Sequence, residues 1–181
     1  MARRRSRGAT HAYSGKQTPY SLASPAILSR HQDTTQNMTH PFTIACVEGW
    51  FDVTHEVEAD DPPLTFTRPD GVGAFQFSTA LYRSGPVPGA SAAVLLSMLR
   101  EFASARELGE PTDIVTEDGE LRLAAASFHW QHDFVRVWYL SDGSSFAQVT
   151  YTCAWGEQAA ELPDCEQMLM TLRFTDETHA A

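Results

Sequence analysis

Residues 121–155, LRLAAASFHWQHDFVRVWYLSDGSSFAQVTYTCAW, carry the strongest secondary-structure signal of the sequence. Three runs within it, at 121–130, 134–140 and 146–155, are rich in the β-branched and aromatic residues that favour strands. The sequence SDG at 141–143 is a strong hairpin signal, and QHD at 131–133 gives a second tight turn. Strands joined by such short turns pair as antiparallel neighbours, so we predict a three-strand meander.

The segment upstream of the meander predicts shorter strands and one helix. Strand-favouring runs alternate there with turns that contain Asp, Pro and Gly. A Pro/Gly loop at 84–89 then leads to an amphipathic helix that begins after Ser91, whose hydroxyl is a natural N-cap. We expect Gly109 to close this helix in the left-handed conformation, and Pro111 prevents its continuation. The strand-favouring runs lie at 42–47, 50–56, 64–68 and 72–83.

A second helix is predicted after the meander. Pro163 suits its first turn, and Asp164 and Glu166 are favourable near the positive end of a helix dipole. The acidic stretch 113–120 is expected to form an exposed hairpin. These elements predict an α+β fold in which an antiparallel β-sheet packs with two main helices. The order is strands, helix, three-strand meander, helix.

Three segments give the chain a resemblance to a known family. They are GAFQFS at 73–78 before the first helix, the meander itself, and MTLRF at 170–174. Their order resembles the PsbP-like α/β/α sandwich family over about residues 42–175. The family occurs in photosystem-associated proteins and bacterial lipoproteins and is mostly non-catalytic, so the resemblance implies no catalytic residue. In size and acidity alone, the chain also resembles bacterial toxin-immunity proteins, whose acidic face would suit a basic nuclease toxin.

Charge divides the chain into two parts. The 181 residues include 13 Lys and Arg and 23 Asp and Glu, a net charge of −10. Six of the basic residues but only one acidic residue lie in residues 1–40, so residues 41–181 hold seven basic and 22 acidic residues, a net of −15. We therefore predict a basic leader at 1–40, a single acidic domain at 41–176 and a tail at 177–181. A domain of this charge is not expected to bind nucleic acid, because phosphates need a basic face.

The leader is predicted to be disordered. Its longest apolar run is AIL at 26–28, which buries too little surface to offset chain entropy. Three explanations stay open: a transit-type targeting segment, a basic interaction arm, or translation that begins at Met38 so that the leader is never made.

Cysteine usage and hydropathy bear on the compartment. The three cysteines form no Cys-x-x-Cys pair, which suits free thiols in a reducing compartment better than a disulfide framework. No stretch approaches the roughly 18 apolar residues that span a bilayer. We therefore expect a cytoplasmic protein that does not bind membranes.

The chemistry-bearing motifs are sparse. The sequence contains no nucleophile elbow, no dinucleotide-binding glycine loop and no Walker lysine. His129, His132 and Asp133 form the one cluster with metal-like chemistry. Only a turn at residues 131–132 would let the two histidines converge, and a further ligand such as His55 would have to come from elsewhere. We prefer to interpret the two neighbouring histidines as surface residues at a hairpin tip, because their spacing is not a recognised zinc signature.

The middle strand of the meander holds the candidate binding residues. It is apolar on both faces, which is typical of a strand that is covered on both sides or that exposes aromatics to a partner. Arg136 beside Trp138, with Trp130 nearby, would hold an acidic or aromatic group by stacking and bidentate bonding. The structural alternative is that Arg136 pairs with a neighbouring acid inside the fold.

These observations favour a non-catalytic binding or protein-interaction module. We expect no catalytic residue and no cofactor, and the acidity of the domain favours a basic protein partner. Two alternatives remain: a toxin-immunity protein, and a small metal-assisted hydrolase that uses His129, His132 and Asp133.

Overall fold

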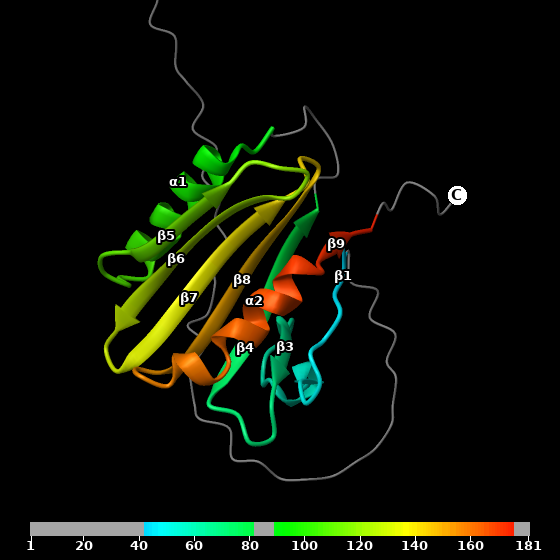
Figure 1. The fold of residues 1–181 in the computed structure, drawn as a ribbon, viewed down its shortest axis with the longest axis vertical. Coiled ribbons are helices and arrows are strands. Elements are labelled where there is room, and N and C mark those ends of the chain that lie inside the picture. The colour runs from blue at the N-terminus through cyan, green and yellow to red at the C-terminus, as the bar shows by residue number, and fades with distance from the viewer. Residues whose placement is uncertain (1–41, 82–88, 176–181) are drawn as a thin grey trace, which may run out of the picture. The chain divides into compact units, whose positions relative to one another are not determined.

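The computed structural model describes residues 42–81 and 89–175 (Figure 1). Four predictions lie outside the described residues: the basic leader, the end of the strand predicted at 72–83, most of the Pro/Gly loop and the C-terminal tail. Among the described residues, no helix is long and apolar enough to cross a membrane.

The described residues form a seven-stranded antiparallel sheet, a two-stranded ribbon and two α-helices, which confirms the predicted α+β fold. The sheet order is β2-β3-β4-β8-β7-β6-β5, and β1 pairs with β9 in the ribbon. The sheet strands are β2 (Phe51–Asp52), β3 (Leu64–Thr67), β4 (Gly73–Leu81), β5 (Thr112–Glu117), β6 (Arg122–Trp130), β7 (Asp133–Ser141) and β8 (Ser145–Ala154). The remaining elements are β1 (Phe42–Thr43), β9 (Arg173–Phe174), α1 (Ala92–Ala105), α2 (Leu162–Met170) and the short 3-10 turns at Thr54–Glu56 and Gln158–Ala160.

The predicted meander is confirmed as β6, β7 and β8. β6 pairs with β7 from Trp130↔Asp133 to Arg122↔Ser141, and the two-residue turn between them places Gln131 at φ 56°. The carboxylate of Asp142 accepts hydrogen bonds from the next turn, where Gly143 has φ 101°. The Asp142–Gly143 turn therefore uses residue types that favour its backbone conformation, whereas Gln131 adopts a left-handed conformation that is uncommon for a non-glycine residue.

The sheet is completed by a pairing between distant segments. β4 runs antiparallel to β8 over nine positions, and joins the N-terminal strands to the meander. Because β4 and β8 are separated in sequence by α1 and three strands, local patterns give no information about this pairing.

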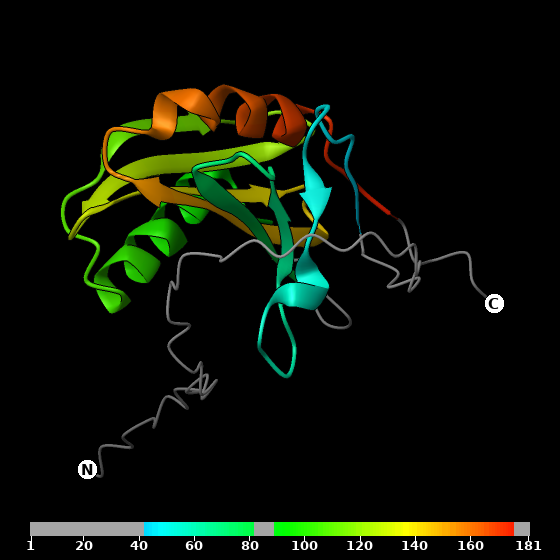
Figure 2. The same ribbon diagram turned by 90° about the horizontal axis from the view of Figure 1, so that it is seen from below.

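Two hydrophobic cores lie on opposite faces of the sheet. Side chains alternate along β7, so Val137 packs toward α1 whereas Trp138 packs toward α2. Figure 2 shows the sheet between the two helices, with α1 on one face and α2 on the other. The core on the α1 side includes Leu95, Leu99, Phe128, Val137 and Tyr139. The core on the α2 side includes Phe75, Phe77, Trp138, Val149, Tyr151, Cys165 and Met168.

The first helix begins as predicted but ends differently. Ser91 accepts a hydrogen bond from the backbone N–H of Val94, which confirms it as the N-cap. The prediction that Gly109 closes the helix is wrong, because Glu107 adopts the left-handed conformation at φ 54°. The N–H groups of Glu107 and Leu108 donate to Ser104 and Ala103, the pattern of a Schellman motif.

Two of the predicted N-terminal strands are much shorter than expected. The runs at 42–47 and 50–56 contribute only the two-residue strands β1 and β2, and Thr54–Glu56 is a 3-10 turn. Asp52 causes part of this difference, since its side chain accepts the Thr54 N–H and so begins a turn.

Candidate functional site

The structure places Arg136 inside the fold. Its side chain is 5% exposed on the α2 face of the sheet. Nη1 donates to the carbonyl oxygen of Asp113 at 2.7 Å and to Ser127 Oγ at 3.1 Å. Nη2 lies 3.9 Å from Glu166 Oε1 on α2. One guanidinium therefore connects β5, β6, β7 and α2.

Burial makes the charge of Arg136 costly, and its neighbours offset part of that cost. Desolvation lowers the pKa of Arg136, whereas the nearby Glu166 and Asp113 raise it. The guanidinium carbon lies 5.6 Å from the ring centre of Trp138, within the range of a cation–π contact. Nε is buried without a hydrogen-bond partner.

The three predicted binding residues do not share one accessible surface. Trp138 is 3% exposed and faces α2 together with Arg136. Trp130 is half-buried and packs against the core on the α1 side. The contacts of Arg136 match the structural alternative, an arginine paired within the fold.

The candidate histidines lie at the hairpin between β6 and β7, where His129 and His132 are both exposed. The turn after Trp130 forms as expected, but the His129 ring stacks on Trp155, with ring centres 3.8 Å apart and planes inclined by 20°. His55 lies in the 3-10 turn, where it is paired with Glu56 at 3.7 Å. Within residues 42–81 and 89–175, no three Cys, His, Asp or Glu side chains converge as metal ligands.

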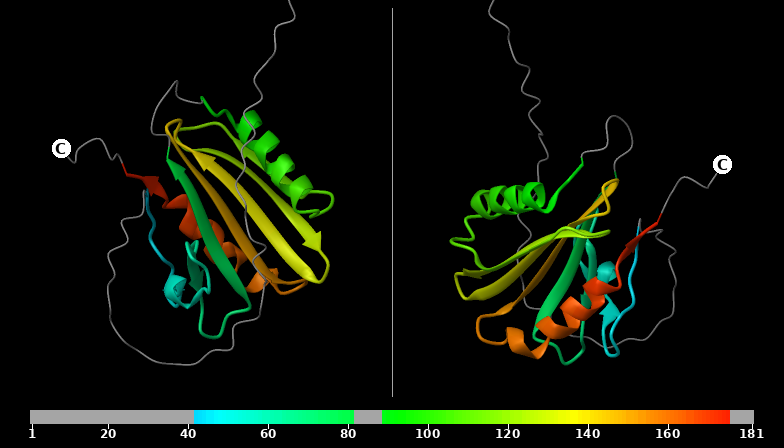
Figure 3. Two further views of the ribbon diagram at one scale, coloured as in Figure 1. Left: turned by 180° about the vertical axis from the view of Figure 1, so that it is seen from behind. Right: turned by 45° about the horizontal axis from the view of Figure 1, so that its top comes forward.

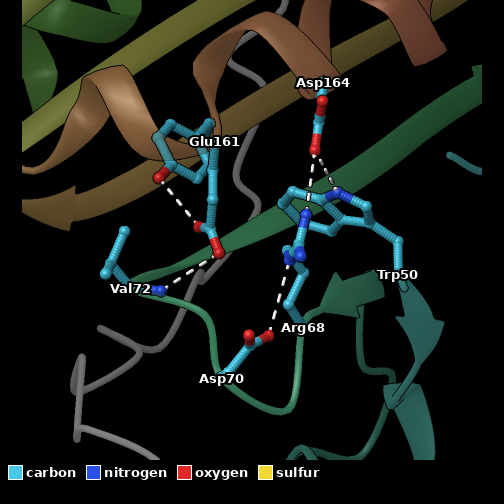
Figure 4. A network of polar contacts seen from close by, with 7 residues as sticks. Trp50, Arg68, Asp70, Val72, Glu161 and Asp164 are labelled. Atoms are coloured by element: carbon cyan, nitrogen blue, oxygen red, sulfur yellow. Dashed lines mark hydrogen bonds and ion pairs between the residues drawn. The ribbon is translucent and has the colours of Figure 1, made fainter. Parts of the chain in front are cut away.

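Glu161 is the most buried acidic residue of the described chain, and no sequence pattern indicates its role. It is 2% exposed and precedes α2. Its Oε2 accepts the hydroxyl of Tyr151 at 2.9 Å, and its Oε1 accepts the backbone N–H of Val72 at 3.1 Å (Figure 4). Both carboxylate oxygens are thus occupied by structural partners that hold the start of α2 against β4 and β8.

Asp164 makes a second set of contacts from the same end of α2. Its Oδ2 accepts hydrogen bonds from Trp50 Nε1 and Arg68 Nη1, both at 3.2 Å. Arg68 also lies 3.6 Å from Asp70 through Nε (Figure 4). This network joins α2 to the segment before β2 and to the turn between β3 and β4, so we assign it a structural role.

β5, the strand at one edge of the sheet, is exposed to solvent. All six residues of β5 are exposed, including the apolar Ile114 and Val115. Val115 pairs with Ala125, which faces α2, so the preceding Ile114 lies on the α1 side. The stretch 113–120 thus belongs to an exposed hairpin, as expected. Its first part is the strand β5, and the turn to β6 follows.

A cleft opens beside β5 on the α1 side. It has a volume of about 650 Å³ and lies between the second half of α1, the loop that follows it and the sheet. Figure 3 shows α1 beside the same end of the sheet as β5. Its walls include Ala103, Ser104 and Glu107 from the α1 end, Glu110 from the loop, Ile114 from β5 and Phe128 from β6.

The surroundings of β5 are acidic. Residues 107–120 contain six carboxylates and no Lys or Arg. Asp118 accepts the Ala92 N–H at 2.9 Å and so helps to cap α1, and all six acidic residues of this stretch are exposed. We call β5 and residues 107–120 around it the acidic edge. The six carboxylates are Glu107, Glu110, Asp113, Glu117, Asp118 and Glu120.

Comparison with solved structures identifies the fold. The solution structure of cyanobacterial PsbP (CyanoP) from Synechocystis sp. PCC 6803 matches 87% of this chain and 100% of its own, with a TM-score of 0.52 and 10% sequence identity. The fold is PsbP-like. This confirms the resemblance predicted from residues 73–78, the meander and residues 170–174. At such low identity the likeness concerns the fold alone.

Other comparisons add little to the PsbP-like assignment. A crystal structure from Bacteroides thetaiotaomicron matches 76% of this chain with a TM-score of 0.47 and 17% identity. This chain covers 46% of that protein's length. No protein-family model and no curated protein matches the sequence.

Proposed function

We propose that the PsbP-like domain is a non-catalytic protein-interaction module whose partner is basic. The observation that carries this proposal is the acidic edge, where exposed Ile114 and Val115 lie among six carboxylates. Protein interfaces commonly combine an apolar centre with a polar rim, and complementary charge speeds association and excludes wrong partners. An immunity role against a basic toxin is one form of this proposal.

A direct contact through Arg136 is not part of the proposal, because its side chain is covered by β5, β6 and α2. A hydrolase that uses His129 is not carried forward either, because the His129 ring is stacked on Trp155. Partner binding at the acidic edge does not require Arg136 or His129 to be accessible.

We also propose that the domain works in the cytoplasm. Cys46, Cys153 and Cys165 are all free thiols, as expected of a protein in a reducing compartment. Fractionation of native cells with an antibody against the domain tests this location. Recovery of the protein outside the cytoplasmic fraction would contradict it.

Charge reversal tests the function. The chain is purified with its bound partners from native cells, and the partners are identified by mass spectrometry. We expect a basic partner whose release increases with salt, since screening weakens contacts between exposed charges. The double variant Glu110→Lys/Glu117→Lys should weaken binding about tenfold or more.

The matched control is Glu48→Lys/Glu58→Lys, which makes the same charge change at exposed positions outside the acidic edge. It should retain most of the binding. Equal losses in the two double variants would show that net charge acts without a localised surface, and a neutral or acidic partner would refute the proposal.

A further inference from the structure

We infer that the basic partner binds by adding an extended strand to β5, with an apolar side chain in the cleft beside α1. This inference rests on the proposed function and specifies its binding mode. It names the partner segment by its chemistry: an extended peptide in which apolar residues alternate with Lys or Arg.

The first support is the position of β5 in the sheet. Within the described residues β5 pairs with β6 alone, and it ends the seven-stranded order. Alternate backbone N–H and C=O groups of an edge strand point away from its neighbour and can pair with another chain. The opposite edge, β2, offers only two residues for such pairing.

The second support is that the edge is held in place before any partner arrives. A register shift occurs between Thr112 and Val115, and Asp113 has φ 47°. The carbonyl of Asp113 is held by Arg136 Nη1 at 2.7 Å. A fixed edge loses less entropy on binding than a mobile one.

The register shift also restricts which residues of β5 can pair with an added strand. Bulges and charges protect natural edge strands from unwanted pairing. Here the irregularity ends before Val115, and the strand then keeps a regular register with β6 through Glu117. Residues 115–117 are therefore the part of β5 that offers a regular edge.

The third support is the cleft. An added strand would place every second side chain on the α1 side, next to Ile114. The exposed apolar side chain of the cleft wall is Ile114, and Ala103 of α1 and Phe128 of β6 lie buried beneath it, so an apolar side chain of the added strand would contact Ile114. An edge strand provides affinity through its backbone, and pockets for alternate side chains provide specificity.

The charge of the acidic edge determines which kind of segment binds there. Residues 107–120 contain six carboxylates and no basic residue, and Arg100 is the one basic residue among those that line the cleft, so Lys and Arg on the added strand would be favoured. A second copy of this chain would bring the same carboxylates to the contact and would be repelled.

A peptide selection on the full chain tests the inference. A random 12-residue peptide library is displayed and selected on the folded protein, and the enriched peptides are synthesised. We expect enriched sequences with alternating apolar and basic residues. Hydrogen exchange should show increased amide protection within residues 115–117 when such a peptide is bound.

Two controls separate strand addition from general attraction. Ile114→Lys should weaken peptide binding at least tenfold, whereas Val94→Lys on α1 should leave it unchanged; the wild-type side chains are 44% and 46% exposed. A peptide with N-methyl groups on alternate backbone nitrogens should lose binding, because it cannot form the strand hydrogen bonds.

The outcomes distinguish the two proposals. If basic peptides bind but N-methylation has no effect, or protection appears away from β5, strand addition is wrong while the interaction function stands. If no basic–apolar peptide is enriched, strand addition is also wrong, and the charge-reversal experiment decides the function separately. A dimer in solution that Ile114→Lys dissociates would show that the occupant is a second copy.

Discussion

Arg136 Nη1 donates a 2.7 Å hydrogen bond to the carbonyl oxygen of Asp113, and this contact adds a side-chain anchor to the backbone pairing between β5 and β6. Asp113 has φ 47°, a conformation that costs a non-glycine residue free energy. The hydrogen bond to a charged donor offsets part of that cost. Arg136, which the sequence suggested as a partner-binding residue, is thus buried and instead holds β5, the strand that we propose binds the partner.

The first prediction concerns the stability provided by Arg136. Arg136→Ala should lower the free energy of unfolding by about 2–3 kcal/mol, because it leaves Asp113 and Ser127 without their donor. Urea denaturation measures this change. Arg136→Met keeps an unbranched apolar stem and should lose less, because apolar replacement of a buried charge is often tolerated. Unchanged stability in Arg136→Ala, together with lost partner binding, would instead support a direct contact.

The second prediction concerns the end of α1. Glu107→Gly should raise the free energy of unfolding by about 0.5–1 kcal/mol, because glycine adopts the left-handed conformation of this position without steric cost. Thermal or urea unfolding checks the gain. As a control, Ser104→Gly lies inside the helix and should destabilise the protein by about 1 kcal/mol. Loss of stability in Glu107→Gly would argue against this helix end.

The third prediction concerns the close contact between β4 and β8. A Cβ atom at Gly73 would lie 2.6 Å from the ring of Tyr151 and 2.7 Å from the carbonyl oxygen of Thr152. Gly73→Ala should therefore cost about 2–3 kcal/mol, as expected for overpacking against backbone. Gly119→Ala is the control, since its nearest neighbour would be 3.7 Å away. Equal stability of the two variants, measured by calorimetry, would disprove this packing.

These examples show which parts of the structure local sequence can predict. The meander and both helices have strong periodicity and turn signals, so residues 121–155 were enough to place β6, β7 and β8. The contacts of Arg136 could not be predicted in the same way, because its partners come from residues 113, 127 and 166. Their convergence depends on tertiary packing, which a periodic pattern in one strand does not encode.

The edge strand β5 could be predicted from the sequence only in part. The segment TDIVTE at 112–117 combines β-branched residues with two acids, a pattern that favours an exposed strand. The acids favour an exposed hairpin, which agrees with the structure, but they do not indicate where its strand ends and its turn begins. The closing residue of α1 was misassigned, because glycine at 109 is a stronger local signal than glutamate at 107.

The last prediction concerns alkaline pH. Burial raises the pKa of Cys165 and of Cys153 above the ordinary thiol value of 9.0, and nearby carboxylates such as Glu161 raise both further. The unfolded chain then loses these protons at lower pH than the folded chain does. The stability contributed by the neutral buried thiols is therefore fully present below about pH 9 and is lost as pH rises toward the folded pKa values.

Urea unfolding at a series of pH values from 7 to 10.5 should thus show a falling free energy of unfolding above about pH 9. Cys165→Ala should reduce the slope, even though it removes core volume. Cys46→Ala is the matched control at an exposed thiol and should change the slope less. Tyr139 and Tyr151 add to the loss above about pH 10, because burial also raises their pKa values. A slope in Cys165→Ala identical to that of the unaltered chain would show that the buried thiol does not govern the alkaline limb.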